Sequence, residues 1–180
     1  MTIRSCELPD DALLHRYRAG GGHADCYATT IARAVRHEDF VAAFYTTWLF
    51  RLERAILGTF AARPSTDAQA RELAAGTAET FAAWRVEARA ADQLLLCDIL
   101  GRTRSWLMSA ADAGGGTRLY FGSAVVPIVD RRTGRKRMGF AFRALLGFHH
   151  LYSRALLHAA ARALERSPSR QRRCSRDSQD

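Results

Sequence analysis

The sequence lacks long apolar runs. Although 48% of its 180 residues are hydrophobic, no stretch reaches the roughly 20 continuous apolar residues that a membrane-spanning helix needs. The N-terminal segment has no apolar core behind Arg4, which a secretory signal would require. We therefore expect neither a transmembrane helix nor a secretion signal, and we interpret the chain as a cytoplasmic protein.

Cysteine is scarce and scattered. The four cysteines are Cys6, Cys26, Cys97 and Cys174, and none stands in the CxxC spacing that holds zinc or carries out redox chemistry. Free thiols are expected. Cys97 lies within an apolar stretch and is interpreted as a small core residue, because burial raises the pKa of a thiol and makes it unreactive.

Metal and cofactor signatures are also missing. His23, Asp25 and Cys26 stand close together, but no second group of ligands completes a four-coordinate site. The chain has no G-x-S-x-G elbow, no P-loop and no dinucleotide fingerprint. The three glycines at 114–116 lack the following helix of a phosphate loop and are interpreted as a hairpin tip. Neither a metal nor a cofactor is expected.

Lysine is almost absent. Lys136 is the only lysine, so the net charge of +9 is carried by arginine, as GC-rich coding favours. Much of the excess lies in a loop at 131–137 and in a tail at 166–180. The favoured interpretation is a solvated loop and a disordered tail. The alternative is a nucleic-acid or acidic-surface binder that works through these two segments.

What the sequence does contain is a definite order of strand and helix patterns. Its length suits one domain, which we place at 1–165 and expect to bury roughly 70% of the unfolded surface. A first strand is predicted after the glycines at 20–22, and then a helical block with its likeliest break at Thr46 and Thr47. Four hairpin-linked strands and one amphipathic helix of roughly 25 residues follow. The predicted ranges are 26–31 for the first strand, 37–58 and 65–76 for helices, 81–89, 93–99, 102–110 and 117–126 for strands, and about 141 onward for the last helix.

Two boundaries have further expectations. Ser65 or Thr66 is expected to cap the second helix, and Gly76 to end it. A sixth strand is possible at 126–129 or 137–140, where the basic loop would form a hairpin or an extended arm.

This order resembles the helix-grip fold shared by START lipid-transfer domains, polyketide cyclases and the birch-pollen allergen proteins. Three segments are also similar to an uncharacterised family of small bacterial proteins: DQLLL at 92–96, GRTRSWL at 101–107 and TRLYFGSAVVP at 117–127. The resemblance implies an α+β fold in which an antiparallel sheet curves around the C-terminal helix. It also implies a cavity between the sheet and that helix.

The resemblance favours binding of a small hydrophobic or amphipathic molecule, lipid- or polyketide-like, in that cavity. Alternate residues of each strand would face the helix, and alternative sets stay open for two strands: Leu94 and Leu96 or Leu95, Cys97 and Ile99, and Tyr120 or Leu119 and Phe121. The candidate ligand-binding residues are Trp84, Cys97, Arg104, Trp106, Tyr120, His149 and Tyr152.

The arginines on these strands have two interpretations. Arg102 and Arg104 share a strand face with Trp106, and Arg118 shares one with Tyr120. The favoured interpretation is a solvent-facing or ion-paired surface, with Glu87 and Asp98 as partners. The alternative is an arginine clamp for a ligand carboxylate.

An enzyme is the second functional hypothesis. A cyclase or hydrolase would use His149, Tyr152, Arg104 or Asp98 in the same cavity. His149 lies on the apolar stripe of the last helix, so a hydrogen-bonded core histidine is the favoured interpretation.

Overall fold

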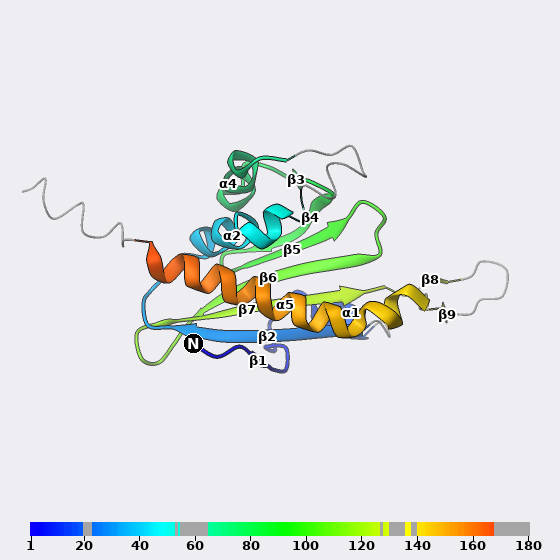
Figure 1. Cartoon of the computed structure of the whole chain (residues 1–180), viewed down its shortest axis with the longest axis horizontal. Helices are drawn as coiled ribbons and strands as arrows, with labels where there is room; N and C mark the ends of the chain where they lie inside the picture. The colour runs from blue at the N-terminus through cyan, green and yellow to red at the C-terminus, as the bar shows by residue number, and fades with distance from the viewer. Residues whose placement is uncertain are drawn as a thin grey trace, which may run out of the picture.

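Seven strands form one antiparallel sheet in the order β1-β2-β7-β6-β5-β4-β3 (Figure 1). The computed structural model describes residues 1–19, 23–52, 54, 65–126, 128–129, 136–137 and 140–167, without the side chains of 19, 23, 128–129, 136–137 and 140–149. The strands are β1 (Arg4–Ser5), β2 (His23–Ile31), β3 (Thr80–Phe81), β4 (Trp84–Ala90), β5 (Gln93–Asp98), β6 (Thr103–Ala111) and β7 (Thr117–Val125). Two further strands, β8 (Ile128–Val129) and β9 (Lys136–Arg137), pair separately, which confirms a hairpin at the basic loop.

The helices with complete bounds in the described residues are α1 (His15–Ala19), α2 (His37–Tyr45), α4 (Asp67–Ala75) and the 27-residue α5 (Phe140–Arg166), and residues 48–52 are helical as well. The predicted α+β class, the meander of β4 to β7 and the long C-terminal helix are confirmed. The predicted break is also confirmed, because α2 ends at Tyr45 and the Thr46 hydroxyl donates to the Ala42 carbonyl at 2.7 Å.

The sequence prediction undercounted the sheet. It placed the first strand at 26–31, whereas β1 precedes it and β2 begins at His23. It missed β1, and it gave β3 and β4 as one strand at 81–89, although the two pair with each other. Both β1 and β3 have only two residues. A period of two residues cannot appear in so short a segment.

The sheet has a core on each face. We call the face covered by α2 and α5 the helix-facing side, and Figure 1 shows α5 running along the sheet there. Its core is rich in aromatic rings, which include Phe40, Phe44, Tyr45, Phe50, Phe81 and Phe121. We call the other face the outer side. It is covered by the N-terminal segment, whose Leu8, Ala12 and Leu14 pack against Trp106 and Met108.

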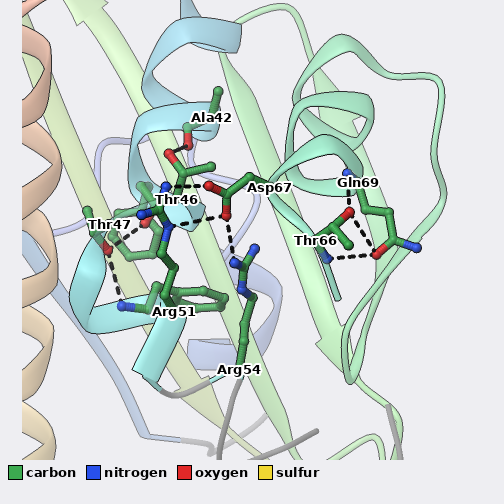
Figure 2. Close-up of polar contacts among 10 residues, drawn as sticks. Ala42, Thr46, Thr47, Arg51, Arg54, Thr66, Asp67 and Gln69 are labelled. Atoms are coloured by element: carbon green, nitrogen blue, oxygen red, sulfur yellow. Dashed lines mark hydrogen bonds and ion pairs between the residues drawn. The ribbon is translucent and has the colours of Figure 1, made fainter. Parts of the chain in front are cut away.

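The start of α4 is fixed by a capping box (Figure 2). The Gln69 backbone N–H donates to Thr66 Oγ1 at 3.3 Å, and the Thr66 N–H donates to Gln69 Oε1 at 2.9 Å. Asp67 follows at the positive end of the helix and accepts hydrogen bonds from Arg51 and Arg54. The expected cap at Thr66 and the helix end at Gly76, with φ 78°, are confirmed.

We expect Thr66→Ala to lower the free energy of unfolding by about 1 kcal/mol, because the Gln69 backbone N–H loses the hydroxyl oxygen that accepts its hydrogen bond. Thr66→Ser is the matched control, since it keeps the accepting oxygen. Urea denaturation of the three proteins measures the difference. Equal midpoints for the alanine and serine variants would contradict a stabilising cap.

Candidate functional site

The predicted site residues lie on both faces of the sheet. Trp84 and Tyr152 pack at the helix-facing core, together with Val86. Trp106, Met108 and Tyr120 belong to the outer core, and Arg104 and Cys97 share that side by alternation with Ser105 and Leu96. His149 lies in α5, but its side chain is outside the described residues. The predicted set therefore does not line one cavity.

The open choices of strand face are now resolved. Leu94 and Leu96 face the helices, as do Leu119 and Phe121. The candidate ligand-binding residues Cys97, Trp106 and Tyr120 therefore lie on the outer side and do not face the C-terminal helix. The reason is that the N-terminal segment supplies a second apolar cover, which the sequence pattern did not reveal.

Arg104 is ion-paired, as the favoured interpretation held. Its Nε lies 3.0 Å from Glu87 Oε2, and its guanidinium stacks 4.4 Å from the centre of the Tyr17 ring. Burial raises the pKa of the Glu87 carboxyl, but the Tyr17 hydroxyl and the Arg104 charge outweigh it and bring the pKa below its ordinary value. Asp98 instead accepts from the Arg102 backbone N–H at 2.7 Å and from the Thr103 hydroxyl at 2.9 Å.

A different group of polar side chains meets under α5. We call Asp25, Tyr27, Ser123 and His150 the Asp25 cluster. Ser123 donates to Asp25 Oδ1 from its backbone N–H at 3.0 Å and from its hydroxyl at 2.7 Å. His150 Nδ1 lies 3.7 Å from Asp25 Oδ2 and is hydrogen-bonded to the Tyr27 hydroxyl. One strand pair and one helix thus bring a carboxylate, a phenol and an imidazole together.

Burial differs sharply within the cluster. The Asp25 side chain is 7% exposed and the His150 side chain is 42% exposed. Burial, followed by the nearby Asp25 charge, raises the pKa of Tyr27 to about 12. Tyr27 therefore keeps its proton at neutral pH, and the imidazole is the group of this cluster that solvent or a ligand reaches most easily.

The cluster continues as a polar row across the sheet. Asp25, Ser123 and Ser105 are direct neighbours on β2, β7 and β6, all on the helix-facing side. The Ser105 hydroxyl lies 3.0 Å from the hydroxyl of Tyr45 on α2. The next row along the same strands contains Tyr27, Phe121 and Leu107 and is otherwise apolar. The polar row therefore borders a mostly apolar row, and buried hydroxyl groups recur one row further along, at Thr29 and Ser109.

Sequence reasoning found only part of this cluster. Asp25 was considered as a metal ligand, and the expected strand began one residue after it. His149 was preferred to His150 because it falls on the apolar stripe of α5. The signal that would have helped is the two-residue spacing of Asp25 and Tyr27, which puts both on one face of β2.

A groove of about 520 Å³ lies beside α5, on the flank away from the Asp25 cluster. Leu49 and Trp48, which is 70% exposed, form one wall. The opposite wall is α5, where His158, Arg162 and Arg166 recur every four residues and so share a helix face. Its lining combines apolar and basic groups.

Comparison of the chain with protein-family models, with curated proteins and with solved structures found no match. Within the part of the chain that the structure describes, no helix has the length and apolarity to cross a membrane. The same residues contain no group of three or more histidine, cysteine or acidic side chains placed to hold a metal ion.

Proposed function

We propose that this protein binds a small amphipathic molecule, lipid- or polyketide-like, between the sheet and α5. The proposal keeps the helix-grip-like arrangement as its framework. The observation that carries it is the polar row of Asp25, Ser123 and Ser105, which lies directly beside the row of Phe121 and Leu107 in the aromatic and aliphatic core. Polar groups beneath a helix cost free energy to bury unless they form hydrogen bonds.

The step from the polar row to the apolar row beside it gives the orientation of the ligand. A hydroxyl or amide of the ligand would lie at Asp25 and His150, where a carboxylate oxygen accepts and an exposed imidazole can donate. The apolar part would extend toward Leu107 and Phe121. Trp84 and Tyr152, which face this side, stay in the proposed ligand set, whereas Cys97, Arg104, Trp106 and Tyr120 leave it.

Native mass spectrometry of gently purified protein, before and after organic extraction, tests the proposal. We expect a defined non-covalent adduct that leaves on extraction. The extracted protein is then loaded with Nile red and titrated with 1-decanol and with decane, which differ only in the hydroxyl. Bare protein at purification, together with equal displacement by the two compounds, would overturn the proposal.

We expect Asp25→Asn to weaken displacement by 1-decanol about tenfold and to leave displacement by decane unchanged, because a hydrogen bond to a charged group is worth about 1.5–3 kcal/mol. Ser109→Ala is the control. It removes a buried hydroxyl from the same face of β6, outside the polar row. A similar loss in both variants would indicate a general effect on the fold rather than recognition at Asp25.

Acid–base catalysis is a second candidate function, and the Asp25 cluster is the specific observation that favours it. A carboxylate beside a half-exposed imidazole is an arrangement that suits a general base. This reading transfers the predicted catalytic role from His149 to His150. The same mass spectra separate the two candidates, because an enzyme would convert its bound molecule over time and a carrier would keep it.

The basic-surface hypothesis depends on other residues. Arg131 to Arg135 and the chain after Ser167 lie outside the described residues, so the structure gives this hypothesis no geometry. It stays a proposal whose signature is an affinity for nucleic acid that falls steeply with salt.

A further inference from the structure

Two cysteines that are twenty residues apart in sequence face each other at the edge of the sheet. The register of β1 with β2 pairs Ser5 with Tyr27, and the ladder continues to Cys6 and Cys26 through a backbone hydrogen bond of 3.0 Å. The two Sγ atoms lie 3.3 Å apart and are hydrogen-bonded to each other, and both thiols are free. Directly hydrogen-bonded antiparallel partners have Cα atoms about 5.5 Å apart, within the range that a disulfide spans.

The two thiols have unequal environments. Cys26 is 2% exposed and packs in the outer core, whereas Cys6 is partly exposed at the edge. The hydrogen bond with Cys26 lowers the pKa of Cys6 to about 7 against the opposing effect of burial, and the Arg118 charge adds to the lowering. The hydrogen bond with Cys6 and burial together raise the pKa of Cys26. Cys6 is therefore suited to attack a disulfide, and Cys26 to resolve the mixed disulfide that this attack forms.

A groove of about 440 Å³ opens beside Cys6. Arg4 and Arg118 line it, together with Ser5, Thr29 and Thr30. Its volume is that of a small-molecule site. Two arginines next to a thiol match a low-molecular-weight thiol or disulfide that carries carboxylates.

We propose that Cys6 and Cys26 form a thiol–disulfide exchange site for an anionic low-molecular-weight disulfide bound between Arg4 and Arg118. The Cys6 thiolate attacks one sulfur of the bound disulfide, the S–S bond of that molecule breaks, and one small thiolate leaves. Cys26 then attacks Cys6 Sγ in the mixed disulfide. The second small thiol leaves with the Cys26 proton, and a Cys6–Cys26 disulfide closes. Two protein thiols are oxidised and one small disulfide is reduced to two thiols.

The test uses the full chain with Cys174→Ser, which removes the cysteine of the tail, and glutathione disulfide as the probe. Intact-mass and peptide analysis should find a Cys6–Cys26 disulfide in this protein. Adding Cys26→Ser should trap one glutathione on Cys6, and adding Cys6→Ser should leave Cys26 unmodified. Cys97, whose pKa burial raises, is the internal control and should stay reduced throughout.

Recognition by the groove is tested with Arg118→Gln and two disulfides. We expect the reaction with glutathione disulfide to slow about tenfold and the reaction with neutral 2-hydroxyethyl disulfide to change little, as electrostatic attraction requires. The proposal is overturned if the Cys26→Ser protein, shown to be folded by its thermal transition, gains no glutathione on Cys6. Equal slowing with both disulfides would overturn the anionic specificity.

Discussion

Replacing Trp106 with alanine should lower the free energy of unfolding by about 4 kcal/mol, the range found when a buried aromatic side chain is removed from a core. Trp106 is fully buried on the outer side of the sheet and lies 6.3 Å from Tyr120, ring centre to ring centre. Its indole N–H donates to Gln93 Oε1 at 2.9 Å, and the same oxygen accepts from the Leu13 N–H at 2.9 Å. The indole thus helps to hold the N-terminal segment on the sheet.

Gly122 shows how closely this ring is packed. It is the direct neighbour of Trp106 on β7, and a Cβ atom there would lie 2.9 Å from Trp106 Cε3 and 2.8 Å from the Asp25 carbonyl oxygen. The glycine provides the space that the indole fills. The sequence prediction placed Trp106 in a ligand site, so the size of the stability loss separates a packed core residue from a cavity residue.

Urea denaturation measures this loss, and Trp106→Phe is the control. Phenylalanine keeps most of the buried area and loses the hydrogen bond to Gln93, so we expect a cost of about 1–2 kcal/mol. An alanine variant as stable as the parent would contradict the packed-core assignment. It would return Trp106 to the ligand hypothesis.

Acid should destabilise the protein through His37, by about 3 kcal/mol in total, because each pKa unit corresponds to about 1.4 kcal/mol. Burial lowers the pKa of His37 from 6.5 to about 4, and the Arg89 charge acts in the same direction. His37 begins α2, where the helix dipole also disfavours a positive charge. Its Nδ1 lies 3.2 Å from the Ser109 hydroxyl, and its Nε2 has no hydrogen-bond partner among the described residues.

The direction follows from proton binding. Between pH 6.5 and about 4 the unfolded chain binds a proton at His37 that the folded protein does not. The stabilisation is therefore complete above pH 6.5 and is lost as the pH falls toward 4. Since carboxylates also titrate in this window, the measurement is the difference between the parent and His37→Gln in urea denaturation at several pH values. A difference that does not change with pH would contradict a neutral, buried His37.

The sequence was a good guide where local chemistry decides the outcome. The β-branched pair at Thr46 and Thr47 ended a helix, and Thr66 began one, because each acts on backbone groups within four residues. Alternation of side chains located β4 to β7, and a sustained helical period located α5, which has 27 residues. The ion pair of Arg104 with Glu87 was also predictable, since β6 and β4, which carry these residues, flank β5 in one meander.

The candidate sites were less predictable, because each one joins distant segments. Asp25 meets His150 only because α5 returns across β2, and Cys6 meets Cys26 only because a two-residue strand adds to the sheet edge. Neither contact produces a characteristic spacing in the sequence, so neither could be predicted from it.

The sequence by itself determined the order of the longer elements, the break after α2 and both ends of α4, since these depend on side-chain period, capping and turn residues close along the chain. Only the tertiary structure decided which face of each strand is covered by α2 and α5 and which by the N-terminal segment. Alternation states that Leu95 and Leu96 point to opposite sides, but not which side receives α5. That choice depends on packing the N-terminal segment against Trp106 and α2 against Phe121, which are contacts between residues far apart in the chain.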